Sequence, residues 1–250
     1  MGTEKRERQR ANRALRQQEQ LKAASRRRTT RIAAIVVGGL VAVFGLVYIA
    51  TLVMGDDDSD TSDTLAPAEC PPEDGVSVPV TQFDEAPPMC LEDGATYEAV
   101  VTTNMGEFTV DLDAEAAPET VNNFVYLARN GYYDETPCHR IIPEFVVQCG
   151  DPTGTGTGDP GYSIDDELPE AGEYVLGSLA MANSGPDTNG SQFFIITGEQ
   201  GEQLPPDYSL FGQVSEGFDT TVADMAATGT PGAGTPSEPV DILSVRIVQS

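Results

Sequence analysis

Two stretches of the sequence decide the fold: residues 138–152, CHRIIPEFVVQCGDP, and residues 178–197, SLAMANSGPDTNGSQFFIIT. In the first, polar and apolar residues alternate on both sides of Pro143–Glu144, which is typical of two short β-strands joined by a turn. The second contains two apolar runs separated by a segment rich in Gly, Asn, Asp and Ser, the residues typical of turns. Together they predict four short strands.

Arg140 is the residue of chemical interest in the first stretch. If the two strands pair as a hairpin, Arg140 and Gln148 come within hydrogen-bonding range of each other. A guanidinium held by a glutamine beside Phe145 would be a directed hydrogen-bond donor at the edge of an apolar surface. The alternative is an arginine that pairs with one of the chain's many carboxylates, and this stretch alone does not separate the two interpretations.

Around these stretches the sequence predicts further strands and two helices. Alternating apolar residues indicate strands at residues 97–103, 107–112, 209–214 and 241–248. One helix is predicted to begin at Pro118 and to end at Gly131, because apolar residues recur at helical spacing between them. A second, amphipathic helix is predicted at residues 216–226. Many short strands without a βαβ rhythm favour a mostly β protein, a barrel or sandwich capped by helices.

Both stretches resemble the cyclophilins, through the ordered motifs HRIIPxFxxQxGDP and MANxGPxTNGSQFFI. The resemblance covers roughly residues 97–248, and the Cys138 and Cys149 positions look like those of exported actinobacterial members. It implies an eight-stranded antiparallel β-barrel capped by two helices. It also implies peptidyl-prolyl cis-trans isomerase activity on one face of that barrel.

The resemblance also implies roles for individual residues. The family's catalytic arginine corresponds to Arg140. The proline pocket corresponds to Phe145, Met181, Phe194 and Leu204. The peptide groove corresponds to Gln148, Ala182, Asn183 and Gln192, with Gly156 at its border. Two positions depart from the family pattern: Tyr208 stands where many members have His, and Gln203 stands at the usual Trp position, which puts cyclosporin sensitivity in doubt. Phe193, opposite in parity to Phe194, is expected in the barrel core.

The expected reaction requires neither a metal nor a cofactor. Isomerisation transfers no proton, so His139, the only histidine, is expected to have no chemical role. One His and four Cys also argue against a His-rich zinc enzyme or a multi-cysteine cluster. The G-x-G-x-x-G match at residues 156–161 has no preceding strand and no following helix, so it predicts a surface loop rather than a dinucleotide site.

The four cysteines leave their pairing open. Cys138 and Cys149 flank the predicted hairpin and lie nearly opposite each other, so a cross-strand disulfide and two buried free thiols are both compatible with the sequence. Cys70 and Cys90 lie in an irregular stretch, where a disulfide would restrict the chain.

Residues 32–54 predict a transmembrane helix, because these 23 positions are uncharged and a helix of that length crosses the hydrocarbon core. The apolar run is too long for a cleaved signal peptide. Eleven Lys and Arg residues precede it and an acidic run follows it, which predicts a cytoplasmic N-terminus. We therefore expect a single-pass cell-membrane protein whose catalytic domain is extracytoplasmic.

The chain is predicted to have four parts: a basic segment (1–31), the transmembrane helix (32–54), an acidic, Pro-rich linker (55–95) and a cyclophilin-like domain (96–250). Residues 32–250 carry 37 acidic residues against three basic ones. Such a body repels phosphate backbones, so nucleic acid is not an expected partner. At low ionic strength it should favour basic polypeptides over acidic ones.

The sequence thus predicts an isomerase that acts on X–Pro bonds of exported proteins and assists their folding. The expected partners are proline-containing segments and the membrane, and the domain is expected to be monomeric. One alternative is a binding module that holds such segments without a catalytic purpose. Another is an inert spacer, which leaves Arg140 unexplained in so base-poor a domain.

Overall fold

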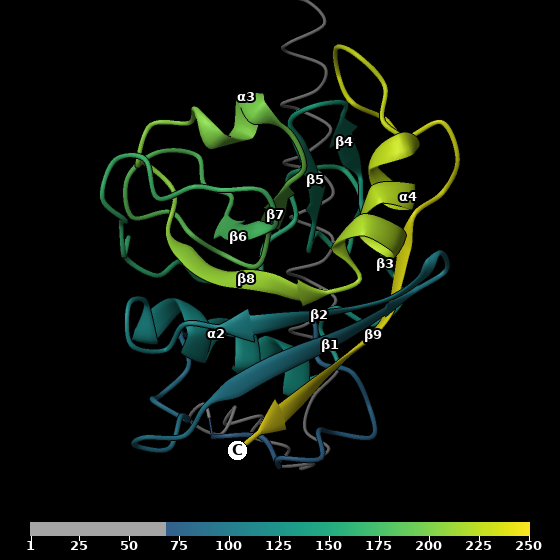
Figure 1. Ribbon diagram of the computed structural model, residues 1–250. Coiled ribbons are helices and arrows are strands. Elements are labelled where there is room, and N and C mark those ends of the chain that lie inside the picture. The colour runs from purple at the N-terminus through teal and green to yellow at the C-terminus, as the bar shows by residue number, and fades with distance from the viewer. Residues whose placement is uncertain (1–68) are drawn as a thin grey trace, which may run out of the picture. The chain divides into compact units, whose positions relative to one another are not determined.

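The computed structural model describes residues 69–250 (Figure 1). The predicted basic segment and transmembrane helix lie outside the described residues. Within residues 69–250, no helix combines the length and the apolar character that a membrane span requires.

The described residues form one curled antiparallel sheet of nine strands. The strands are β1 (Tyr97–Thr103), β2 (Gly106–Leu112), β3 (Thr136–Pro137), β4 (Arg140–Ile142), β5 (Val146–Cys149), β6 (Ser178–Met181), β7 (Phe193–Ile196), β8 (Leu210–Glu216) and β9 (Asp241–Gln249). Their order across the sheet is β3-β9-β1-β2-β8-β6-β7-β5-β4. The edge strands β3 and β4 are separated in the chain by only Cys138 and His139, so the sheet must curl until its two edges adjoin. The expected count of eight strands was wrong by one, because the two-residue β3 also pairs with β9.

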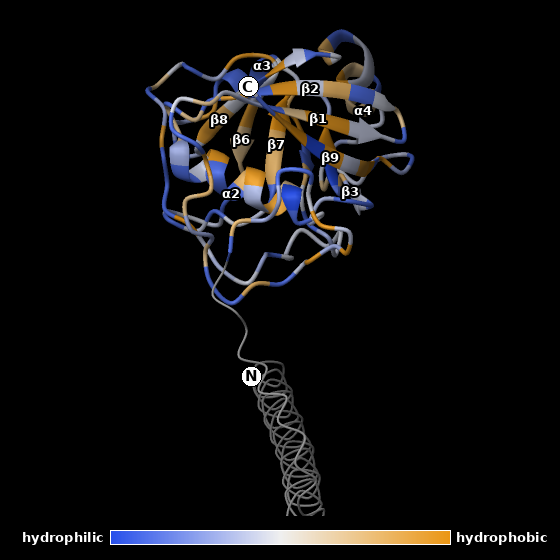
Figure 2. Ribbon diagram, turned by 90° about the horizontal axis from the view of Figure 1, so that it is seen from below, coloured by the Kyte–Doolittle hydropathy of each residue, from blue (hydrophilic) through white to orange (hydrophobic). Residues whose placement is uncertain are grey.

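Alternation along the strands builds the barrel core. In β1, and in β2 from Phe108 to Leu112, every second side chain is buried and the intervening ones are half-buried or exposed, as the predicted alternation requires. Figure 2 shows the mainly apolar strands β6 and β7 beside β8. One face of β5, β6 and β7 packs into the main core, and the other carries a smaller apolar cluster around Val146, Ala180 and Phe194.

Helix α2 (Pro118–Arg129) closes one end of the barrel and agrees with the predicted helix. Pro118 occupies the first turn, where its missing N–H costs no hydrogen bond. Ala117 provides no side-chain cap. Instead, the Glu167 carboxylate accepts hydrogen bonds from the backbone N–H groups of Glu119 and Thr120, at 3.0 and 2.7 Å. A negative charge at this end of a helix is also favourable to the helix dipole.

The remaining helical segments are short. The second predicted helix is a π-helical turn at Phe218–Val222 that continues into α4 (Ala223–Ala227), and α3 (Glu199–Glu202) is a single additional turn. The described part of the chain is therefore a mostly β protein, a curled antiparallel sheet with a few helices.

Residues 69–95, called the arm below, contain no helix or strand but pack on the domain. The arm is the blue segment beneath α2 in Figure 1. The N–H groups of Val76 and Val80 donate to the carbonyl oxygens of Arg129 and Asn130, both at 2.9 Å, at the end of α2. A Cys70–Cys90 disulfide joins the two ends of the arm. These residues fall within the predicted linker, and they lie against the domain rather than extending from it.

Candidate active site

Arg140 and Gln148 face each other across the β4–β5 hairpin, as predicted. They are register partners, and the Arg140 Nη1 donates to Gln148 Oε1 at 3.1 Å. The guanidinium carbon lies 5.8 Å from the centre of the Phe145 ring. Within residues 69–250, Arg140 forms no ion pair with a carboxylate. The interpretation of Arg140 as a directed donor beside an apolar surface therefore fits the geometry, and the carboxylate-paired alternative does not.

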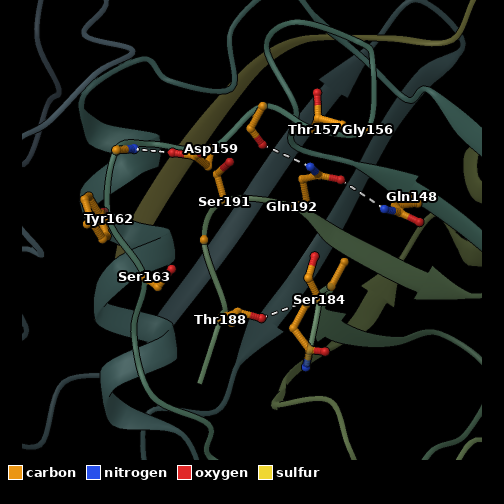
Figure 3. A pocket seen from close by; sticks show the side chains of 15 residues that line it. Gln148, Gly156, Thr157, Asp159, Tyr162, Ser163, Ser184, Thr188, Ser191 and Gln192 are labelled. Atoms are coloured by element: carbon orange, nitrogen blue, oxygen red, sulfur yellow. Dashed lines mark hydrogen bonds between the residues drawn. The ribbon is translucent and has the colours of Figure 1, made fainter. Parts of the chain in front are cut away.

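A row of amide side chains continues from this pair. Gln148 Nε2 donates to Gln192 Oε1 at 3.0 Å, and Gln192 Nε2 donates to the carbonyl oxygen of Gly158 at 3.0 Å (Figure 3). Each amide uses both its donor and its acceptor, which fixes its orientation. The free donors of the Arg140 guanidinium are therefore held in one direction by a chain of bonds that ends on the backbone.

Beside the guanidinium lies an apolar hollow of about 210 Å³. It is lined by Arg140, Phe145, Val146, Gln148, Ala182, Asn183, Phe194, Leu204 and Tyr208. The Phe194 and Tyr208 rings meet edge to face at 5.4 Å. The Tyr208 backbone is fixed by Tyr174, whose hydroxyl donates to the Tyr208 carbonyl at 2.7 Å. A small apolar ring fits this hollow, with one cationic donor at its rim.

A second, larger hollow of about 420 Å³ adjoins the first (Figure 3). The two share Gln148, Ala182 and Asn183, so they form one continuous groove. Its other walls are residues 156–163 and the segment 184–192, and most of the lining side chains are polar. The groove therefore offers an apolar recess for one residue and polar surroundings for its neighbours.

Asp151 organises the loop that borders the second hollow. It is completely buried. Its carboxylate accepts hydrogen bonds from the N–H groups of Thr153, Gly156 and Gly158, at 2.7, 2.6 and 3.1 Å. Burial opposes ionisation, but the hydrogen bonds to the charged form outweigh it and lower the pKa of Asp151 to about 2. Sequence reasoning assigned no role to this carboxylate, although a lone Asp before a glycine-rich loop was a usable signal.

Most of the residues predicted for the site come together in the groove. Phe145, Phe194, Leu204 and Tyr208 line the first hollow, Gly156 and Gln192 line the second, and Gln148, Ala182 and Asn183 line both. The Asn183 side chain donates to the carbonyl oxygen of Asp207 at 2.8 Å. Phe193 points the other way, into the core, where its ring meets those of Phe124 and Tyr133.

Met181 is the exception. It is completely buried in the main core and does not line either hollow. Its strand β6 presents Ala180 and then Ala182 to the groove side, so Met181 must point inward. The apolar wall is completed instead by Val146, which sequence reasoning missed. Val146 has the same strand parity as Gln148, and that parity would have identified it.

His139 lies on the opposite side of the strand from Arg140. Neither of its ring nitrogens has a hydrogen-bond partner among the described residues. Burial lowers the pKa of His139; the Asp151 charge opposes this shift and the Arg140 charge adds to it. The imidazole is therefore neutral at pH 7 and lies against the glycine-rich loop, 3.6 Å from where a side chain at Gly156 would begin.

Cys138 and Cys149 form a disulfide, with their Cα atoms 4.0 Å apart. Of the two alternatives that the sequence left open, the structure has the cross-strand bond. The bond joins the residues that flank His139–Arg140 on one side and Gln148 on the other. It therefore closes the open end of the hairpin that carries the donor pair.

With this geometry in view, the comparisons with known proteins identify the family. The family model "Cyclophilin type peptidyl-prolyl cis-trans isomerase/CLD" matches residues 99–247, more than half of the chain. The chain belongs to this family and is a cyclophilin-type peptidyl-prolyl cis-trans isomerase.

Individual relatives agree with this assignment. "Peptidyl-prolyl cis-trans isomerase-like 1" of Gibberella zeae is 42% identical over 158 residues, which cover 62% of this chain and 96% of the relative. "Probable peptidyl-prolyl cis-trans isomerase B" of Mycobacterium tuberculosis is 37% identical over 171 residues, which cover 62% of this chain and 55% of that one.

Solved structures are similar as well. The crystal structure of a cyclophilin-type isomerase of Cryptosporidium parvum matches with a TM-score of 0.57 and 34% identity, over 61% of this chain and 98% of that one. The same isomerase crystallised in the presence of the dipeptide Ala-Pro matches with a TM-score of 0.56 over 60% of this chain.

Proposed function

We propose that this isomerase is anchored in the cell membrane by residues 32–54, with its catalytic domain outside the cytoplasm, and that it accelerates the folding of exported proteins. Support for the anchor comes from the uncharged run and its flanking charges. The two disulfides support an oxidising compartment, since such bonds persist there. The observation that carries the catalytic part is the position of Arg140, at the rim of a hollow that fits a proline ring.

The reaction needs stabilisation of a twisted amide, not bond cleavage. Rotation about an X–Pro bond breaks C–N resonance, at a cost of about 18–20 kcal/mol. Uncatalysed exchange takes on the order of tens to hundreds of seconds. A thousand turnovers per second would require the barrier to fall by roughly 7 kcal/mol. The chemistry itself calls for no nucleophile, metal or cofactor.

In this proposal Arg140 provides the differential interaction. As the amide twists, its nitrogen becomes pyramidal and gains a lone pair that the planar amide lacks. The Arg140 guanidinium can donate a hydrogen bond to that lone pair, so it binds the transition state more strongly than the ground state. Gln148 and Gln192 hold the guanidinium in place beforehand, so little reorganisation is required during the reaction.

The groove would confine the rotation to one side of the bond. Phe145, Val146 and Phe194 would hold the proline ring and exclude water, which strengthens the hydrogen bond from Arg140. The backbone of Asn183 and the side chain of Gln192 would hold the flanking peptide. The reacting bond then lies between a fixed ring and a fixed peptide segment.

Replacement of Arg140 by Ala tests this assignment. We expect kcat/KM for a proline-containing peptide to fall by about 10²–10³-fold, which is typical of the loss of one preorganised donor. The assay follows isomerisation by NMR exchange spectroscopy on the purified full-length chain in detergent.

Arg246→Ala is the matched control, since Arg246 is an exposed arginine on β9 outside both hollows. It should retain wild-type activity, and both variants should keep the wild-type circular dichroism spectrum. Near-normal activity of the Arg140 variant would refute the proposed role.

A further inference from the structure

The arm contacts the substrate groove as well as α2. Phe83, near its middle, is partly buried against the main core. Its ring packs against three tyrosines, with centres 5.2 Å from Tyr126, 6.4 Å from Tyr132 and 6.2 Å from Tyr162. Tyr162 also lines the second hollow. Phe83, which precedes the family-matched region 99–247, thus contacts a residue that lines the groove.

The contact continues along the backbone. The Phe83 N–H donates to the carbonyl oxygen of Pro160 at 2.8 Å. At Gly161 the arm lies so close that an added Cβ would collide with the Phe83 carbonyl oxygen and the Gln82 side chain. The arm and the loop therefore approach each other through backbone atoms, which only glycine at position 161 allows.

The segment that the arm contacts, residues 159–163, is a wall of the second hollow and is called the wall segment below. Asp159, Gly161, Tyr162 and Ser163 all line the hollow. On its other side, the wall segment is tied to α2, because the Tyr162 hydroxyl donates to Asn123 Oδ1 at 2.7 Å. The preceding part of the loop is held by Asp151. The wall segment is held by Asn123 and by the arm, and Ile164, which follows it, pairs with Asn189.

We propose that the arm is a specificity element of this isomerase, in which Phe83 is a positioning residue that fixes the wall segment and so determines which residues flanking an X–Pro bond the second hollow accepts. The inference rests on the proposed use of the groove for peptide binding. The ligand class is a peptide with polar residues next to the X–Pro unit, since the second hollow is lined mainly by hydroxyl, amide and backbone groups. The apolar hollow, which the arm does not contact, should bind the proline itself without its help.

The test compares two peptides on the full-length chain. One is a capped Ala-Pro unit that reaches only the apolar hollow, and the other extends it by three polar residues on each side. NMR titration gives a dissociation constant for each peptide, and the ratio of the short-peptide constant to the extended-peptide constant is the preference for the extended peptide. For Phe83→Ala we expect this preference to fall about fivefold, an ordinary loss for one flanking contact region, while the affinity for the short peptide stays within about twofold.

Two matched pairs of variants separate a positioning role of Phe83 from a general loss of stability. Val78→Ala alters an arm residue that is 71% exposed and should change neither constant. Gly161→Ala should reproduce the Phe83→Ala effect from the loop side. Gly172→Ala is its control, because Gly172 also has a positive φ (+90° against +100°) but no atom near its added Cβ. Amide hydrogen exchange should accelerate in residues 159–163 of the Phe83 variant and stay unchanged in β5.

Equal losses for both peptides, or an unchanged preference in Phe83→Ala, would overturn the proposal. Unchanged exchange in the wall segment would overturn it as well. A different result would refute the proposed function itself: the wild-type chain would not accelerate isomerisation of the short peptide. Because binding and exchange are measured separately from rate, they decide the role of the arm in either case.

Discussion

The role of a side chain in this domain depends on which side of its strand it occupies. Met181 and Ala182 are neighbours in the chain, yet Met181 is buried in the main core and Ala182 lines the groove. The same rule places Val146 beside the apolar hollow and Val147 in the core. A residue type that suits an apolar pocket therefore does not identify the pocket unless its parity agrees.

Met181→Ala and Val146→Ala should consequently have different effects. Met181→Ala leaves a cavity in the closed core, so we expect it to lower the free energy of unfolding by about 2–5 kcal/mol, with KM for a proline peptide unchanged. Val146→Ala removes part of the wall of the hollow and should raise KM about 15-fold, since it deletes two methyl groups that each contribute about 0.8 kcal/mol. Urea unfolding and steady-state kinetics measure the two effects. A Met181 variant with the larger KM effect would contradict this placement.

Hairpins and loops, rather than single residues, hold the site together. The β4–β5 hairpin carries the Arg140–Gln148 pair, and the Cys138–Cys149 disulfide closes its open end. The glycine-rich loop is held by the Asp151 carboxylate, which accepts from N–H groups that would otherwise lack partners. Each element therefore has one local feature whose removal can be tested.

Loss of the hairpin disulfide should destabilise the domain. For Cys138→Ser/Cys149→Ser we expect a decrease of about 2–3 kcal/mol in the free energy of unfolding, because a short loop is no longer closed in the unfolded chain. Activity should fall as well, because the open end of the hairpin that carries Arg140 is no longer joined. Urea unfolding and kcat/KM provide the measurements. Cys70→Ser/Cys90→Ser is the comparison: it removes a bond in the arm and should leave kcat/KM for the short peptide unchanged.

Asp151 should make stability depend on acid pH. Its pKa is about 2 in the folded protein and about 3.9 in an unfolded chain, so its contribution is complete above about pH 4 and is lost as the pH falls toward 2. Asp151→Asn should be less stable than wild type at pH 7 and should lose less stability between pH 4 and pH 2. Urea unfolding across this range checks the slope. Parallel pH profiles for the two proteins would show that the carboxylate charge is not what holds the loop.

At the level of the complete chain, the prediction concerns the proposed membrane topology. The strongly basic residues 1–31 and the acidic remainder predict opposite sides for the two parts. The proposed topology places the isomerase domain, which the family model matches over residues 99–247, outside the cytoplasm.

Protease protection tests the proposed topology. The experiment uses cells whose outer layers have been removed but whose cell membrane is intact. Added protease should degrade residues 69–250 and leave an epitope placed before residue 5 protected. Detergent should expose the epitope. Protection of the catalytic domain in intact cells would contradict an extracytoplasmic location, without affecting the assignment as an isomerase.

Part of this architecture was predictable from the sequence. The strands at 97–103 and 107–112, the helix that begins at Pro118 and the Arg140–Gln148 pairing all depend on alternation, helical spacing and turn residues over about ten positions. Such patterns reflect which face of an element is buried, and they act within the element itself. The strand parity that distinguishes Val146 from Val147, and Met181 from Ala182, is a local property of the sequence as well.

The alternating strands, their turns and the motifs that mark a cyclophilin-type isomerase follow from the amino-acid sequence, because they are properties of neighbouring residues. Other features are visible only in the folded chain: the groove joins Gln148, Gln192 and Tyr208, Glu167 caps α2, and Phe83 of the arm packs against the wall segment. These contacts join residues 16 to 79 positions apart. They form only when the sheet curls until β3 and β4 adjoin. That closure cannot be predicted from the spacing of apolar residues within a single strand or helix.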